Sequence, residues 1–197
     1  MSTEEHAVQD AVAGWKVRVG RPLSARGEAT LVRAAQGGSA EAVDELFRRH
    51  WGAAHRAAWL IVRDASAAED IAQEAFLSAL RSLDRFDRRR PLGPWLHRIV
   101  VNRAIDWSRA RALRPETSAD AVLEPVAQEP DGGVGEDVVA ALAALGPEQR
   151  AVVVLRHLLG YTPGEIATML ELPRGTVNSR LRRALDALAV ALGEDRR

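Results

Sequence analysis

A basic, polar run near the C-terminus has the residue types that hydrogen-bond with DNA. Between Pro173 and Ala184 there are four Arg and no acidic residue. Arg and Asn side chains can form two hydrogen bonds with the edge of one base, whereas Ser, Thr and flanking Arg suit phosphate oxygens. An ordinary amphipathic helix with a basic solvated face would have the same composition, so the run alone leaves both interpretations open. The candidate DNA contacts are Arg174, Thr176, Asn178, Ser179, Arg180, Arg182 and Arg183.

Two short helices must position this run. Thr162-Pro163-Gly164-Glu165 has the pattern of a capping box with Pro at the first helical position, which predicts a helix start. That helix can extend only to about Leu170, because Leu172-Pro173 forces a turn before the next helix. The pattern indicates a helix-turn-helix, whose second helix can enter the major groove. Opposite the basic side, the second helix has an apolar stripe at Val177, Leu181, Leu185 and Leu188.

A second candidate surface is rich in hydrogen-bond acceptors. On a helix, Asp70, Gln73 and Glu74 share one face, which could bind Arg side chains of a partner. A solvated helix face without a partner explains the same pattern equally well. Another face of this helix is apolar, with Ala72, Phe76, Ala79, Leu80 and Leu83.

A third candidate surface follows from the uneven distribution of charge. The net charge is zero, yet residues 81–114 have ten Arg and three Asp, whereas residues 115–137 have seven acidic residues and no basic one. Local charge, not total charge, decides whether a polyanion is bound. On a helical wheel Arg98, Asn102 and Arg109 align, and Arg103 falls towards the inner side. The side predicted to face the core has Trp95, Ile99, Val100 and Trp107.

The elements that hold these surfaces are all predicted to be helices. Alternating strand patterns are absent, whereas Ala, Leu, Glu and Arg recur with helical spacing. We expect an all-α fold with a mobile extension (1–27), one helical domain (28–114), a flexible acidic linker (115–136) and a second helical domain (137–193). The predicted helices span residues 28–36, 40–62 (capped by Ser39), 66–83 (opened by Ser66), 94–112, 137–144, 147–159, 163–170 and 175–192.

Several classes of function are disfavoured by what the sequence lacks. It has no Cys, which excludes disulfides and thiolate zinc sites, and no apolar run of the roughly 20 residues that span a bilayer. The acidic N-terminus is not a signal peptide, so we expect a cytoplasmic protein. Glu69, Asp70 and Glu74 have no His at metal-ligand spacing, and His50 and His55 do not share a helical face. We therefore expect no enzyme activity, no catalytic residue, no metal and no cofactor.

Together these motifs resemble the extracytoplasmic-function (ECF) group of the sigma-70 family of bacterial RNA polymerase. Leu155-Arg156, Gly160, Glu165-Ile166-Ala167, Leu170, Pro173, Gly175-Thr176-Val177 and Ser179-Arg180-Leu181 are similar to sigma region 4. The resemblance implies that this domain recognises the promoter −35 element, with Arg156 added to the candidate residues of the basic run.

The N-terminal motifs resemble sigma region 2. The segment around Asp70, Gln73 and Glu74 is similar to region 2.2, which docks on the clamp coiled coil of the polymerase β′ subunit. Residues 95–107 are similar to regions 2.3 and 2.4, which recognise and open the −10 element, and the loop 87–94 to the segment that holds a flipped base. The implied −10 contacts are Asp87, Arg88, Arg89, Arg90, Arg98, Asn102, Arg103, Asp106 and Arg109.

The resemblance also implies partners. A sigma factor binds core RNA polymerase, including its β′ and β subunits, and promoter DNA, and an anti-sigma factor is a further partner of many members. The linker is too short for a region 3 domain and would lie in the RNA exit path, where its acidic residues could mimic nucleic acid. We expect a monomer when free. The alternative is a one-component regulator that binds duplex DNA through its helix-turn-helix without polymerase, with residues 28–112 acting as a sensor.

Overall fold

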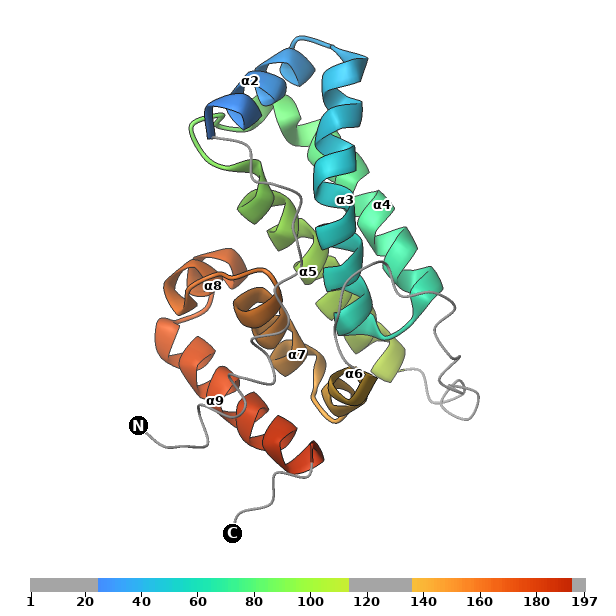
Figure 1. Ribbon diagram of the computed structural model, residues 1–197, viewed down its shortest axis with the longest axis vertical. Helices are drawn as coiled ribbons and strands as arrows, with labels where there is room; N and C mark the ends of the chain where they lie inside the picture. The colour runs from blue at the N-terminus through green and yellow to red at the C-terminus, as the bar shows by residue number, and fades with distance from the viewer. Residues whose placement is uncertain (1–24, 114–135, 193–197) are drawn as a thin grey trace.

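The computed structural model describes residues 25–113 and 136–192, and every regular element among them is helical (Figure 1). Residues 25–113, the N-terminal half, form α2 (Ala25–Gln36), α3 (Ala40–Val62), α4 (Ala65–Ser82), the short 3₁₀ turn η1 (Leu83–Arg85) and α5 (Leu92–Ala112). Residues 136–192, the C-terminal half, form α6 (Glu136–Ala143), α7 (Pro147–Val153), the π-helical turn η3 (Val154–Leu158), α8 (Pro163–Leu170) and α9 (Arg174–Ala191). Most of the predicted extension and linker lies outside the described residues.

Local capping interactions fix the ends of the helices. Ser39 caps α3 as predicted, because its hydroxyl accepts the amide hydrogen of Ala42 at 3.2 Å. The predicted start of α4 at Ser66 was one residue late: the helix begins at Ala65, and its cap is Asp64, whose carboxylate accepts from the amide of Ala67 at 2.9 Å. Both Asp and Ser are good N-caps, so the spacing alone did not decide between them.

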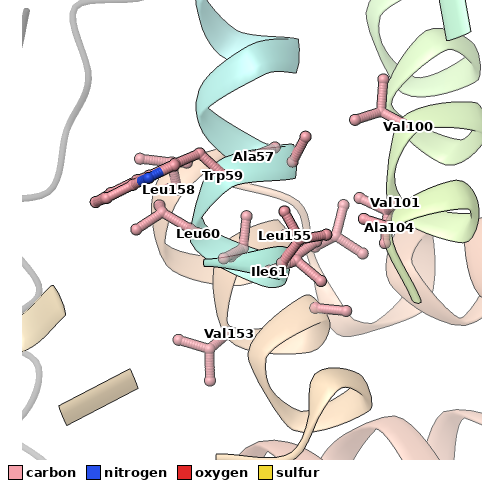
Figure 2. Close-up of a cluster of buried hydrophobic side chains, with 14 of the residues drawn as sticks. Ala57, Trp59, Leu60, Ile61, Val100, Val101, Ala104, Val153, Leu155 and Leu158 are labelled. Atoms are coloured by element: carbon pink, nitrogen blue, oxygen red, sulfur yellow. The ribbon is translucent and has the colours of Figure 1, made fainter. Parts of the chain in front are cut away.

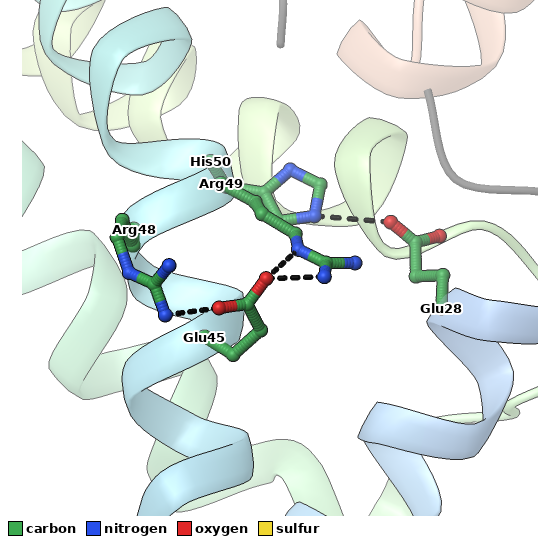
Figure 3. A network of polar contacts seen from close by, with 5 residues as sticks. All are labelled: Glu28, Glu45, Arg48, Arg49 and His50. Atoms are coloured by element: carbon green, nitrogen blue, oxygen red, sulfur yellow. Dashed lines mark hydrogen bonds and ion pairs between the residues drawn. The ribbon is translucent and has the colours of Figure 1, made fainter. Parts of the chain in front are cut away.

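Glu28 of α2 contacts His50 in the middle of α3 (Figure 3) and also the first residue of α5. One carboxylate oxygen lies 3.0 Å from Nε2 of His50, and the other accepts the backbone amide hydrogen of Leu92 at 3.0 Å. Leu92 is the first residue of α5, where amide groups have no acceptor within the helix. The hydrogen bond with His50 and that with Leu92 lower the pKa of Glu28, although partial burial opposes them. This contact fixes where α5 begins.

The two halves share one hydrophobic core. The end of α3 and the middle of α5 pack against α7 and η3, which bring Val153, Leu155 and Leu158 towards the N-terminal half (Figure 2). Leu60, Ile61 and Leu155 are completely buried in this cluster. The sequence predicted two helical domains but did not predict how they are placed. In the structure the C-terminal half lies against the lower part of α3 and α5 (Figure 1).

Candidate nucleic-acid and protein interfaces

The helix-turn-helix is formed by α8 and α9. Thr162 and Glu165 make the predicted capping box: the Thr162 hydroxyl accepts from the amide of Glu165 at 3.3 Å, and the Glu165 carboxylate accepts from the amide of Thr162 at 2.8 Å. The apolar stripe of α9 faces the core, with Val177, Leu181 and Leu188 buried and Leu185 partly buried. The opposite face of α9 is therefore directed to solvent, as the periodicity predicted.

Most of the predicted −35 residues lie on that outer face. Arg174, Asn178, Arg182 and Arg183 are exposed, whereas Thr176, Ser179 and Arg180 are half-buried. Arg156 is placed differently: it is half-buried on η3, and its guanidinium donates to the backbone carbonyl of Tyr161 at 3.2 Å. Arg156 therefore holds the loop before α8, a structural contact that the sequence did not predict.

The predicted acceptor-rich face is exposed on α4. Asp70, Gln73 and Glu74 all point to solvent, and Gln73 donates to Glu69 at 3.1 Å. Arg103 of α5 donates to Glu74 at 2.6 Å, so it does not lie on the inner side of its helix as the wheel suggested. This ion pair joins one predicted polymerase contact to one predicted −10 contact, across 29 positions of sequence.

Exposed apolar side chains lie beside the acceptor-rich face, and of these the sequence singled out neither Leu77 nor Phe47. Leu77 and Leu80 of α4 and Phe47 of α3 are 51%, 38% and 40% exposed. Leu80 belongs to the apolar face that the sequence indicated, and it lies partly at the surface. Beside it, an apolar groove is lined by Phe47, Phe76, Leu80 and other side chains of α3, α4 and α5. Phe47 and Phe76 pack with ring centroids 4.8 Å apart, which holds the groove together.

The predicted −10 residues lie along the outer side of α5 and in the loop before it. Asn102 and Asp106 are exposed, as are residues 87–90 of the loop. The Asp87 carboxylate accepts from the amide of Arg89 at 3.0 Å, and the Asp87 carbonyl from the amide of Arg90 at 2.9 Å, so the loop forms a compact turn.

The two tryptophans of α5 are mainly packing residues, as predicted. Trp95 is partly buried, and its ring lies 4.7 Å from that of Phe86. Trp107 is also partly buried against the core, and the Arg111 guanidinium lies over it at 5.1 Å. The described contacts of both rings are therefore with other side chains of the same chain.

Two arginines of the −10 face are paired with the C-terminal half. Arg98 forms an ion pair with Glu171, at the end of α8. Arg109 donates to Glu148 of α7 through two nitrogens, at 2.7 and 2.9 Å, and also lies 3.7 Å from Asp106. Partial burial raises the pKa of Glu148, but the hydrogen bonds with Arg109 and the backbone, together with the charges of Arg109 and Arg180, hold that pKa below its ordinary value. Neither pair across the halves was foreseen from the sequence.

His97 of α5 lies in the contact between the halves. Its Nδ1 is 2.7 Å from the Tyr161 hydroxyl, and its Nε2 is buried without a partner. Burial, together with the positive charge that His50 can acquire, lowers the pKa of His97 to about 3. Burial also raises the pKa of Tyr161, with smaller contributions from Glu165 and Glu28. Both side chains are therefore neutral at physiological pH.

Acidification is expected to weaken the fold through His97. The unfolded chain protonates this residue below pH 6.5, whereas the folded chain does so only near pH 3, so its contribution is complete above pH 6.5 and falls as the pH decreases between these values. Between pH 7 and pH 5.5 we expect a loss of roughly 1 kcal/mol in the free energy of unfolding from this group.

Urea denaturation at a series of pH values measures this effect. His97→Gln should reduce the slope of unfolding free energy against pH. His157, whose pKa is lowered to about 4 by burial and Arg156, and His55, whose pKa is lowered by burial, should supply part of the slope that remains. An unchanged slope in His97→Gln would contradict the assignment.

The described residues contain no group of His, Cys, Asp and Glu side chains that could hold a metal ion. Among the helices of residues 25–113 and 136–192, none is both long and apolar enough to cross a membrane.

Comparisons with known proteins match both halves. Sigma-70 region 2 matches residues 46–114, and Sigma-70 region 4 matches residues 135–188. The ECF RNA polymerase sigma factor SigM of Mycobacterium tuberculosis is 38% identical over 168 residues, which cover 85% of this chain and 86% of SigM. The RNA polymerase sigma-H factor of Pseudomonas aeruginosa is 33% identical, over 82% of this chain and 92% of that protein.

Two solved structures are similar to the whole fold. CnrH in complex with the cytosolic domain of CnrY has a TM-score of 0.65 and 29% identity, covering 86% of this chain and 99% of CnrH. The sigma factor RpoE in complex with the anti-sigma factor NepR, from Bartonella quintana, has a TM-score of 0.65 and 26% identity, covering 78% of this chain and 98% of RpoE.

Proposed function

The chain belongs to the extracytoplasmic-function sigma factors of the sigma-70 family, and from this premise we propose which of its surfaces perform each step of promoter recognition. As an RNA polymerase sigma factor it functions in transcription initiation. The observation that best supports the assignment of surfaces is that the three predicted polar faces are all at the surface, on α4, α5 and α9.

The proposed polymerase contact is the acceptor-rich face of α4. Asp70, Gln73 and Glu74 present carboxylate and amide oxygens, which suit the basic side chains of a partner such as the β′ clamp coiled coil. The exposed Leu77 and Leu80 beside them would supply apolar area to the same interface. An interface with an apolar centre and charged contacts at its edge is typical of specific protein complexes.

The proposed −35 contact is the outer face of α9. A recognition helix places its side chains in the major groove, where Arg and Asn can distinguish bases by paired hydrogen bonds. Asn178 and Arg182 are exposed and four positions apart, so they lie on the same side of the helix. Arg174 and Arg180 flank this strip and suit phosphates.

The proposed −10 contacts are the outer face of α5 and the loop 87–94. Asn102 is the central exposed polar residue of that face, and the loop at the start of α5 is compact and polar. Such a loop could bind a base that has been flipped out of the melted strand.

Substitution of Asn102 is expected to change which base is accepted at the −10 element. Asn102→Ala removes a group that can form two hydrogen bonds with a base, so discrimination at one position should fall by about 1 kcal/mol or more. Open-complex formation by holoenzyme on a panel of −10 variants measures the effect. Because Asn102 lies on α5, outside the acceptor-rich face of α4, polymerase affinity should not change, and an unaltered rank order of the variants would exclude Asn102 as the recognising residue.

Further partners are proposed from the relatives. RpoE and CnrH were solved in complexes with NepR and the cytosolic domain of CnrY, and we propose that an anti-sigma factor regulates this chain as well. The protein would act in the cytoplasm, where polymerase is, and would have no catalytic activity of its own. A polymerase-independent regulator is disfavoured, because the region 2 match covers residues 46–114, most of the segment that such a regulator would use as a sensor.

Run-off transcription with purified core polymerase tests the proposal. The full chain should make core enzyme initiate at discrete promoters, and start-site mapping across a genome should yield a shared −35 and −10 sequence. Specific binding to duplex DNA without polymerase, combined with no transcription from holoenzyme, would instead favour the regulator.

A further inference from the structure

We propose that α2 positions the loop 87–94: Glu28 and Gln36 of α2 hold the two ends of this loop, so that base selection at the −10 element depends on a helix outside the three proposed contact faces. The inference rests on the proposed function of the loop. Helix α2 (Ala25–Gln36) precedes residues 46–114, the segment that matches Sigma-70 region 2, so the family match assigns it no role.

Glu28 holds the C-terminal end of the loop. Its carboxylate accepts the backbone amide hydrogen of Leu92, the first residue of α5, at 3.0 Å. The residue before α5 is Pro91, whose side chain has no acceptor, and α5 has no side-chain cap from that position. A negative charge at a helix start also interacts favourably with the helix dipole. Glu28 therefore supplies from α2 the cap that the sequence around Pro91 lacks.

His50 of α3 orients the Glu28 carboxylate. Its Nε2 lies 3.0 Å from one carboxylate oxygen, while the other oxygen accepts from Leu92 (Figure 3). The hydrogen bond with His50 lowers the pKa of Glu28 most, and that with Leu92 lowers it further, against the effect of partial burial. Glu28 is therefore ionised at physiological pH and accepts both hydrogen bonds as a carboxylate. The side chains of Glu28 and His50 are only 22% and 14% exposed, which limits competition from water.

Gln36, the last residue of α2, holds the other end of the loop. Its side-chain nitrogen donates to the backbone carbonyl of Leu83 at 2.9 Å and to that of Phe86 at 3.1 Å. These carbonyls belong to the first residue of η1 and to the residue that follows η1, directly before Asp87. An amide nitrogen has two hydrogens, one for each carbonyl. Gln36 therefore fixes the backbone at the point where the loop begins.

The two polar residues lie on one face of α2, with a buried residue between them. Glu28, Val32 and Gln36 are spaced four residues apart, which places them on the same side of a helix. Val32 is 1% exposed and belongs to a small hydrophobic cluster that also contains Leu83 and Leu92, from the two ends of the loop. One face of α2 is thus joined to both ends of the loop by polar and apolar interactions.

The held ends give the loop a fixed base. The rings of Phe86 and Trp95, which precede and follow the loop, lie 4.7 Å apart. Within the loop, the Asp87 carboxylate accepts from the amide of Arg89 at 3.0 Å, and the side chains of residues 88–90 are exposed. Groups that select a flipped base must stay in place, which requires supporting hydrogen bonds and packing behind them. Helix α2 supplies this support.

The experiment compares holoenzymes that contain full-length variants. Glu28→Leu removes the acceptor for the Leu92 amide, and Gln36→Met removes both donors at similar side-chain size. Glu28→Gln is the conservative variant, because its amide oxygen can still accept from Leu92. Ile61→Val, in the main core, controls for a general loss of stability, and Asp44→Asn, at an exposed acid, controls for the loss of one negative charge.

One measurement reports base selection and another reports the structure of the loop. Open-complex formation is measured on promoter fragments with single −10 substitutions, made from a promoter that start-site mapping identifies for the wild-type holoenzyme. The rates give the discrimination between the preferred base and each substituted base. Hydrogen exchange of the free chain, followed by mass spectrometry, gives the protection of the backbone amides of residues 84–92.

We expect Glu28→Leu and Gln36→Met each to lower discrimination at one −10 position by roughly fivefold to tenfold, the factor that corresponds to the net contribution of one hydrogen bond. The Leu92 amide should exchange faster in Glu28→Leu. Affinity for core polymerase and −35 preference should stay at wild-type values. Glu28→Gln should retain both the amide protection and the discrimination.

A variant of the loop itself separates this inference from the proposed function. Arg88→Ala, Arg89→Ala and Arg90→Ala together, the loop triple variant, should lower −10 discrimination. Adding Glu28→Leu should then have little further effect, since α2 acts through the loop and effects at coupled positions are not additive. If the loop triple variant keeps the wild-type −10 preference, the proposed function of the loop fails.

The role of α2 alone would be overturned if Glu28→Leu and Gln36→Met keep full discrimination while the loop triple variant loses it. A loss no larger than in Ile61→Val or Asp44→Asn would overturn it too, as would an equal further loss when Glu28→Leu is added to the loop triple variant. Unchanged exchange of the Leu92 amide in Glu28→Leu would show that Glu28 does not hold the loop. A loss in only one of the two α2 variants would overturn the role of the other residue.

Discussion

Reversing the charges of Asp70 and Glu74 is expected to weaken binding of the chain to core RNA polymerase by about 2 to 5 kcal/mol, the usual cost of losing charged contacts that become desolvated in an interface. Both carboxylates are exposed on α4 in the free chain, so they are available to a partner. The variant Asp70→Arg with Glu74→Arg would place positive charge against the basic side chains that the acceptor-rich face is proposed to bind.

Titration of core polymerase with labelled protein measures the affinity. Asp44→Arg with Asp84→Arg is a matched control, because both residues are exposed acids of the N-terminal half and lie outside the proposed interface. Glu74 also holds Arg103, so Glu74→Gln alone shows how much of any effect follows from loss of that ion pair. A dissociation constant that changes no more than in the control would exclude this face as the docking surface.

The Glu74–Arg103 ion pair shows which features of the structure the sequence predicts and which it does not. Helical periodicity placed Asp70, Gln73 and Glu74 on one exposed face correctly, because side-chain direction along a helix depends only on spacing. The same wheel put Arg103 towards the inner side and did not predict its ion pair with Glu74. A long side chain can leave the direction of its Cα–Cβ bond to reach a carboxylate on a neighbouring helix, and nothing local in the sequence encodes that neighbour.

Elsewhere in the chain, too, interactions between residues close in sequence were predicted, whereas interactions between distant residues were not. The Thr162–Glu165 capping box spans four residues and was predicted in full, since its hydrogen bonds join groups that are adjacent in any helix start. The contact between Glu28 and Leu92 joins residues 64 positions apart, and that between Arg98 and Glu171 joins residues 73 positions apart. Charge counts did indicate that residues 81–114 are basic, but they did not indicate which acids lie opposite.

The position of the C-terminal half determines which assay can measure the contribution of α9 to −35 recognition. In the structure, α9 presents its outer face to solvent, while Arg98 and Arg109 of α5 form ion pairs with Glu171 and Glu148. Because two arginines of the proposed −10 surface are paired within the free chain, the free chain does not offer both proposed DNA surfaces at once. For this reason the assay of α9 variants requires holoenzyme and promoter DNA, not the free chain.

Under those conditions Arg182→Ala is expected to cost roughly 1 to 3 kcal/mol of promoter binding if its guanidinium pairs with a base, and to relax the preference for one −35 base pair. Arg182 is exposed and opposite the buried stripe of α9, so the fold should be retained. Arg183→Ala should have a smaller effect, because its Nε already donates to the carbonyl of Ser179 at 3.2 Å and has less freedom to reach a base.

Loss of a phosphate contact should affect binding differently from loss of a base contact. This difference shows which kind of contact each arginine of α9 makes. Arg174→Ala or Arg180→Ala should weaken binding about equally on all −35 sequences and reduce the dependence of affinity on salt. Arg33→Ala, an exposed Arg of α2, controls for the loss of one positive charge. Holoenzyme affinities for −35 variants at several salt concentrations supply both quantities. If Arg182→Ala lowers affinity uniformly and leaves the −35 preference intact, α9 contacts only the DNA backbone, and the base-recognising residues must lie elsewhere.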